Sequence, residues 1–107
     1  MYMESANHIL YNDLTPSDAS LWASRVIAVP LLIPNSKLTK SFYDLIPSTY
    51  LICEKDQNIS VQWQEKFAAT ANANVIRCSA GHSPMLSRPD LLVSIIKDIS
   101  GWKYVKT

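Results

Sequence analysis

The sequence predicts an α/β fold built on a βαβα unit with parallel strands. Two short apolar runs, residues 49–53 and 74–79, are typical of buried strands. A segment with helical periodicity follows each run, over residues 60–73 and then from residue 87 to residue 99. Strand, helix, strand and helix in this order pair parallel strands through a right-handed crossover. Because sheets usually have about five or six strands, either residues 1–47 hold unrecognised strands or the chain is part of something larger.

The first helix is expected to begin at Thr15-Pro16-Ser17-Asp18, which places a hydroxyl cap, a proline and a carboxylate in order. It should continue to about Ile27. Pro30 and Pro34 then exclude a helix, so residues 30–47 form an irregular connection. The apolar face of this helix is predicted to hold Ala19, Leu21, Trp22 and Val26.

Ser60 is expected to cap the second helix, which ends before Asn74. Its predicted apolar face carries Trp63, Phe67 and Ala71, and both Trp22 and Trp63 are expected in the core. Ser87-Arg88-Pro89-Asp90 reads as a capping box for the last helix, and Gly101 ends it. The apolar face of this last helix is predicted to contain Leu92, Ile95, Ile96 and Ile99.

Charge and hydropathy make several classes of partner poor candidates. Ten Lys and Arg against nine Asp and Glu give a formal net charge of +1, so no field favours nucleic acid or anionic lipid. No apolar run approaches the roughly 20 residues of a membrane span. The start of the chain lacks the pattern of a secretory signal, so the cytoplasm is the expected location. Cys53 and Cys78 are expected to be buried free thiols, and no metal or cofactor is expected.

One acidic and one basic side chain follow the two predicted strands. Asp56 comes after the strand ending at Cys53, and His82 comes after the strand ending near Ser79. Reactive groups in parallel sheets collect at the carboxyl ends of the strands. Asp56 and His82 are 26 residues apart (82 minus 56), which is the length of chain that one strand-to-strand crossover needs. A carboxylate there can hold one imidazole nitrogen while the other nitrogen accepts a proton, although chance alone can also place an Asp and a His in such loops.

The amino-acid sequences of these segments resemble those of the α/β-hydrolase superfamily. Residues 51–60 and the run Ala80-Gly81-His82-Ser83-Pro84 resemble most closely the branch of plant methyl esterases and hydroxynitrile lyases with bacterial and fungal relatives. The resemblance implies that Asp56 is the triad acid and His82 the triad base. Residues 11–19 resemble the end of the cap region of that branch. The implied organisation is a remnant of the cap and a connection over 1–47, followed over 48–107 by the carboxy-terminal βαβα part of a hydrolase core.

The nucleophile of that family has no counterpart in this sequence. An α/β-hydrolase holds its serine in a G-x-S-x-G turn upstream of the acid. The chain has two glycines, Gly81 and Gly101, and both lie downstream of Asp56. The chain is therefore expected to be inactive alone, as a fragment of an enzyme that hydrolyses small apolar esters. Two alternatives stay open: a non-catalytic interaction module that associates through an exposed sheet edge, and part of a hydroxynitrile-lyase-type enzyme.

Overall fold

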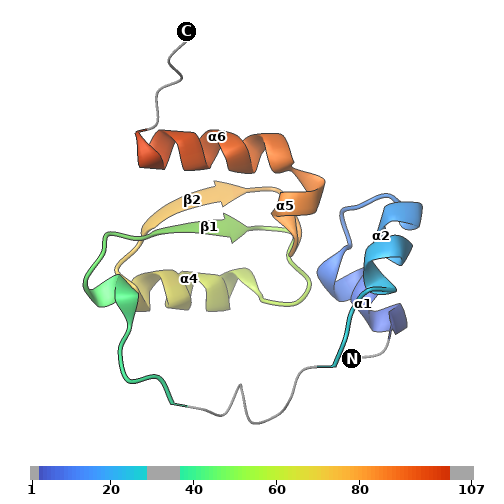
Figure 1. The fold of residues 1–107 in the computed structure, drawn as a ribbon, viewed down its shortest axis with the longest axis horizontal. Helices are drawn as coiled ribbons and strands as arrows, with labels where there is room; N and C mark the ends of the chain where they lie inside the picture. Colours follow the sequence, from blue (N-terminus) through green and yellow to red (C-terminus); the bar gives the residue numbers. More distant parts are fainter. Residues whose placement is uncertain (1–2, 29–36, 102–107) are drawn as a thin grey trace, which may run out of the picture.

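The computed structural model describes residues 3–28 and 37–101. Figure 1 shows two strands lying between two helices, with a pair of short helices near the carboxyl ends of the strands. In chain order the elements are α1 (Met3–Leu10), α2 (Pro16–Ala23), the 3-10 helix η1 (Phe42–Asp44), β1 (Thr49–Cys53), α4 (Val61–Thr70), β2 (Asn74–Cys78), α5 (Pro84–Ser87) and α6 (Pro89–Ser100).

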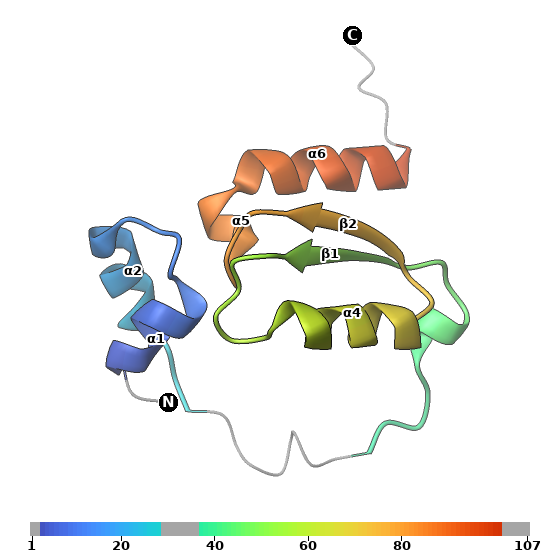
Figure 2. The ribbon, with the colours of Figure 1, turned by 180° about the vertical axis from the view of Figure 1, so that it is seen from behind.

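The two strands pair in parallel, as predicted. The register runs from Thr49 opposite Asn74 to Cys53 opposite Cys78. Helix α4 connects the strands and α6 follows β2, so the βαβα order and the α/β fold are confirmed. Seen from behind in Figure 2, both strands again end beside α1 and α2.

One edge of β1 faces away from β2. The backbone N–H of Asn74 donates to the carbonyl of Ser48, and that of Glu54 donates to the carbonyl of Cys78. Alternate residues of a parallel strand bond to the same neighbour, so even-numbered residues of β1 bond to β2. The odd-numbered residues therefore direct their backbone groups toward the opposite edge, where the described residues place no further strand.

The side chain of Gln64 occupies part of that edge. Its Oε1 accepts from the N–H of Cys53 at 2.9 Å, and its Nε2 donates to the carbonyl of Cys53 at 3.0 Å. Nε2 also donates to the carbonyl of Ile59 at 2.9 Å. A neighbouring strand would use the same donor and acceptor of Cys53. Gln64, which is 2% exposed, thus makes the strand-like contacts at the end of β1 through a side chain.

The first helix is shorter than predicted. α2 ends at Ala23 rather than near Ile27, and the hydroxyl of Ser24 donates to the carbonyl of Leu21 at 2.6 Å. Such a bond to a backbone carbonyl competes with continuation of the helix. Its beginning is as predicted, because Thr15 accepts from the N–H of Asp18. Ala19 is buried, whereas Leu21 is 46% exposed, so its placement on the apolar face was wrong. Residues 29–36, of which 30–36 belong to the predicted connection, lie outside the described residues.

The predicted apolar face of α4 was also wrong. Trp63 and Phe67 are 55% and 45% exposed and contact each other with ring centroids 6.0 Å apart. Gln64 and Ala68 are the buried residues instead. The helical period of about 3.6 residues shows which side chains share a face of the helix, but it does not show which face packs against the sheet. Ser60 does cap the helix by accepting from the N–H of Trp63.

The last helix begins at Pro89, so its cap lies one residue after the predicted cap Ser87. The hydroxyl of Ser87 donates to Ser83, and Arg88 stands at the cap of α6 without a side-chain bond. The short helix α5 separates this segment from the loop after β2, and the sequence did not indicate it, nor α1. Gly101 ends α6 with φ of 64°, as predicted. Ile96 and Ile99 were expected to be packed but are each 56% exposed.

The core consists mainly of small side chains. Cys53, Cys78 and Ala80 form a buried cluster, against which Leu51 and Leu91 pack. Ile52 is the one large side chain with under 2% exposure among the described residues. A sheet of two strands covers only a narrow strip of each helix, which leaves the larger apolar residues outside.

Removing the amide of Gln64 should destabilise the chain. In Gln64→Ala the N–H of Cys53 loses its partner and the carbonyl of Cys53 keeps only the bond from the N–H of Asp56, so the free energy of unfolding should fall by about 1–3 kcal/mol. Urea unfolding monitored by circular dichroism measures this loss. Gln62→Ala, which changes an exposed residue of the same helix, serves as the control and should stay within about 0.5 kcal/mol of the parent. Equal losses for the two variants would contradict the role of Gln64.

Candidate active site

Asp56 stands in a tight turn just beyond β1. Its N–H donates to the carbonyl of Cys53, which bends the chain away from the strand. Its Oδ1 accepts from the backbone N–H groups of Asn58 at 2.8 Å and Ile59 at 3.1 Å. The side chain is only 6% exposed. The carboxylate is therefore held in one orientation by bonds from its own loop.

The loop with His82 runs beside the loop with Asp56. The pairing of the strands continues past their ends, because the N–H of Lys55 donates to the carbonyl of Ala80 at 3.0 Å. His82 follows two residues later, and the buried Ser83 comes next. Adjacent parallel strands thus deliver an acid and an imidazole to the same edge of the sheet.

The two side chains meet in a bifurcated contact, in which one ring nitrogen faces both carboxylate oxygens. Nδ1 of His82 lies 2.9 Å from Oδ2 and 3.1 Å from Oδ1 of Asp56. Against a carboxylate, Nδ1 carries the proton and donates, so we assign the neutral ring to the Nδ1–H tautomer. Nε2 is then left with a lone pair. The structure brings together the two residues that the sequence singled out; their catalytic role stays a prediction.

Nε2 of His82 has a weak neighbour within the same site. Nδ2 of Asn58 lies 3.5 Å away, at the limit of a hydrogen bond, and Asn58 is exposed. The His82 side chain is 28% exposed. A hydroxyl brought to Nε2 would therefore have to displace no more than one long contact from a surface amide.

A cavity of about 340 Å³ lies beside β1 and includes both residues of the pair in its wall. Much of the rest of its lining is apolar. The apolar contributors come from β1, its following loop and the α5–α6 segment: Leu51, Ile59, Pro84, Met85 and Leu92. Ligand pockets are commonly about 300–1,000 Å³ and largely apolar with a few polar groups, so this cavity is of suitable size and chemistry for a small organic molecule.

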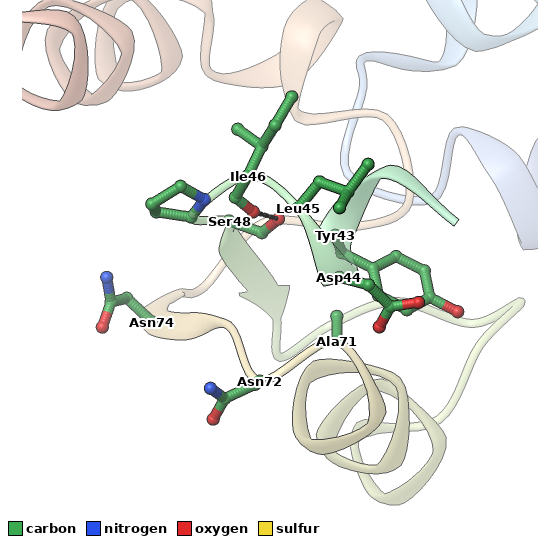
Figure 3. A pocket seen from close by; sticks show the side chains of 9 residues that line it. Tyr43, Asp44, Leu45, Ile46, Ser48, Ala71, Asn72 and Asn74 are labelled. Carbon is green, nitrogen blue, oxygen red and sulfur yellow. Dashed lines mark hydrogen bonds between the residues drawn. The ribbon is translucent and has the colours of Figure 1, made fainter. Parts of the chain in front are cut away.

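A second cavity, of about 330 Å³, lies at the opposite end of the sheet. Figure 3 shows its wall, built from residues 43–48 on one side and from Ala71, Asn72 and Asn74 on the other. The hydroxyl of Ser48 donates to the carbonyl of Ile46 there. The lining contains no histidine or cysteine, so it offers no pair comparable to Asp56 and His82.

Two side chains that the sequence reading did not single out also reach the site. Asn12 and Asp13 contact the residues just before Asp56 and His82, from 43 and 68 positions away in the chain. Neither periodicity nor motif spacing encodes contacts over such separations. Within residues 3–28 and 37–101 no group of three or more His, Cys, Asp or Glu is arranged to hold a metal ion. In that same part of the chain no helix has the length and apolar character needed to cross a bilayer.

Comparison with known proteins shows which proteins this chain is similar to. No family model matches the chain. The alpha/beta hydrolase nvfD of Aspergillus novofumigatus is 34% identical over 100 residues, which is 92% of this chain and 40% of that protein. A protein named "Probable hydrolase R7" from a Phoma species is 32% identical over 69 residues, covering 59% of this chain and 28% of its own length. These likenesses support the α/β-hydrolase superfamily. The chain spans less than half the length of either relative.

Asp56 and His82 are in contact, and their order in the chain, an acid before a histidine, matches that of the α/β-hydrolase triad. A G-x-S-x-G turn is absent from the 107 residues, since both glycines lie after the acid.

The Cys53 thiol lies next to this acid–base pair but is poorly suited to act as a nucleophile. Burial raises the pKa of Cys53 from 9.0 to about 12, and the neighbouring Cys78 thiol adds to the rise. The two sulfur atoms are 4.0 Å apart, and both cysteines are buried and free, as predicted. The reactive form of cysteine is the thiolate, so Cys53 stays in its unreactive form near neutral pH.

This shift predicts a loss of stability at alkaline pH. Between about pH 9 and pH 12 the folded chain keeps the Cys53 proton that the unfolded chain releases. The free energy of unfolding should therefore fall as pH rises through that range, and the contribution is fully present below pH 9. Urea midpoints at pH 8 to 11 measure the slope. Cys53→Ala should flatten it, whereas an unchanged slope in that variant would show that other groups cause the decline.

Proposed function

We propose that Asp56 and His82 are the acid and base of an acyl hydrolase whose serine nucleophile lies outside these 107 residues. The observation that carries the proposal is the contact of Nδ1 with both carboxylate oxygens, at 2.9 and 3.1 Å. This contact fixes the ring so that Nε2 can take a proton. The similarity to proteins named hydrolases over up to 92% of the chain supports it.

In the proposed reaction the serine hydroxyl attacks the carbonyl carbon of an ester. Nε2 of His82 accepts the hydroxyl proton as the new C–O bond forms, and Asp56 stabilises the imidazolium. The tetrahedral intermediate collapses, the ester C–O bond breaks, and His82 returns the proton to the leaving alcohol. Water then attacks the acyl-serine by the same route and releases the acid. A small, fairly apolar ester suits the lining of the 340 Å³ cavity.

The nucleophile in this proposal comes from the part of the protein that this chain does not cover. The chain corresponds to 40% of the Aspergillus relative, and in the family order the serine precedes the acid. A longer form of the protein, extended at its amino terminus by the residues encoded upstream, would then contain the serine together with Asp56 and His82. The chain alone should show little activity, because a base without nucleophile and oxyanion donors accelerates hydrolysis weakly.

Substitutions in the longer form test the roles. His82→Ala should reduce kcat toward p-nitrophenyl butyrate by roughly 10⁴-fold or more, and Asp56→Asn by about 10⁴-fold, because each disables the base. His8→Ala is the matched control and should keep full activity, since this exposed histidine belongs to α1. A serine-directed acylating reagent should abolish hydrolysis. Activity that survives His82→Ala would refute the proposal.

A second candidate function is an interaction module, which the free edge of β1 favours. The backbone groups of Thr49 and Leu51 face away from β2, whereas those of Cys53 are bonded to Gln64. Exposed strand edges pair with strands of other chains. In this proposal the edge binds a second copy of the chain or a full-length relative.

Blocking the edge without breaking the sheet tests the second candidate. Thr49→Pro removes an N–H that points away from β2, so it should abolish self-association while preserving the fold. Sedimentation velocity at increasing concentration measures the association. A parent chain that stays monomeric, with the longer form active as an esterase, would exclude the module and retain the hydrolase.

A further inference from the structure

A segment of the amino-terminal region crosses the edge where Asp56 and His82 meet. It comprises residues 10–13, at the end of α1 and the turn after it. The Nδ2 group of Asn12 donates to the carbonyl of Lys55 at 2.9 Å. Lys55 directly precedes Asp56 in the chain. One side chain of the segment therefore holds the backbone on the acid side of the pair.

The neighbouring residue holds the other loop. Oδ2 of Asp13 accepts from the backbone N–H of Gly81 at 2.7 Å, and Gly81 directly precedes His82. On the other side of the histidine, the hydroxyl of Ser83 donates to the carbonyl of Leu10 at 2.8 Å. The residue on each side of His82 is thus bonded to the same short segment, Gly81 through its backbone and Ser83 through its side chain.

Gly81 permits the close approach of this segment. A Cβ built on Gly81 would collide with Oδ1 of Asn12 and would lie 2.8 Å from Oδ1 of Asp13. Both oxygens are buried and accept no hydrogen bond within the described residues. Their close approach to the loop leaves these two acceptors without partners, which is a cost that ordinary packing avoids. Such an arrangement is expected where geometry at a site outweighs local stability.

We propose that Asn12 and Asp13 are positioning residues that fix the distance and the ring orientation between Asp56 and His82. This inference rests on the proposed function, because it assigns the acid–base roles to that pair. Asn12 acts on the acid loop and Asp13 on the histidine loop, and the Lys55–Ala80 bond joins the two loops directly. With all three links present, neither loop can shift without breaking a bond to a third segment.

The chemistry of the two side chains matches these tasks. The Lys55 carbonyl requires a donor, and the amide of Asn12 supplies one. The Gly81 N–H requires an acceptor, which Asp13 supplies as an oxygen. Aspartate therefore cannot replace asparagine at position 12, because its carboxylate would face the Lys55 carbonyl and could not donate a hydrogen bond to it. Position 13 in contrast should tolerate asparagine, whose side-chain oxygen can accept the same bond.

Nitrogen-15 NMR of the 107-residue chain tests the inference through the tautomer of His82. In the parent, neutral His82 should exist as a single Nδ1–H tautomer, held by Asp56. Asn12→Ala and Asp13→Ala should lose this preference and show a mixture of tautomers, with faster exchange of the Nδ1 proton. Asn12→Asp, which keeps the shape but not the donor, should also lose it. Asp13→Asn should retain the parental tautomer.

The controls separate positioning from general damage. Asp18→Ala and Asn74→Ala change exposed side chains of the same types and should leave His82 as in the parent. His8 is an internal reference whose signals should stay constant in every variant. Amide shifts of β1 and β2 report whether each variant is folded. A folded Asn12→Asp variant with a single Nδ1–H tautomer would overturn the proposal, as would loss of that tautomer in folded Asp13→Asn.

Failure of this inference is distinguishable from failure of the proposed function. If the parent shows the single tautomer and the variants behave as expected, but the longer form hydrolyses no ester, the positioning role stands and the hydrolase assignment falls. If the longer form is an esterase dependent on His82 while the variants leave the tautomer unchanged, the opposite holds. A parent chain whose His82 shows no Nδ1–H preference would overturn the positioning role outright.

Discussion

The candidate site depends on the parallel pairing of β1 and β2 beyond the ends of the strands. The bonds from Glu54 to Cys78 and from Lys55 to Ala80 carry the register of the sheet into both loops. Each loop then needs only a tight turn to present its functional side chain. A pairing shifted by one residue would turn the side chains of one strand to the other face of the sheet and so separate Asp56 from His82. The strand pairing therefore brings Asp56 and His82 to the same place, and the bonds from Asn12 and Asp13 contact the two loops there.

The proposed division of the catalytic residues between this chain and the rest of a longer protein has a structural basis. An acid and a histidine on neighbouring strands with one crossover between them can be contributed by a short continuous stretch of chain. A serine in a strained turn and its oxyanion donors require other strands of the same sheet. The chain supplies the first set together with the amino-terminal segment that braces it. The similarity to 40% of a longer α/β-hydrolase agrees with this division.

The sequence predicted the elements better than it predicted their orientation. Residues 49–53 were located correctly because apolar and β-branched residues are continuous there, and Asp56 and His82 followed from the rule about strand ends. The faces of the helices were partly misassigned. Trp63 and Phe67 have the right spacing for a packed stripe, but Gln64 takes the position against β1 because it can satisfy the backbone of Cys53. The contacts of Asn12 and Asp13 could not be predicted, since they join segments 43 and 68 residues apart without any pattern between them.

The amide of Gln64 has a consequence for any complete sheet that includes β1. Since the outward N–H and carbonyl of Cys53 are already saturated, a strand lying alongside can bond to β1 only at its earlier residues. At Cys53 that strand must splay away, three positions before Asp56. The sheet would fork there, beside the cavity whose wall includes Cys53, Gln64 and His82. A side chain from a helix thus ends the ladder of backbone bonds along this edge of β1.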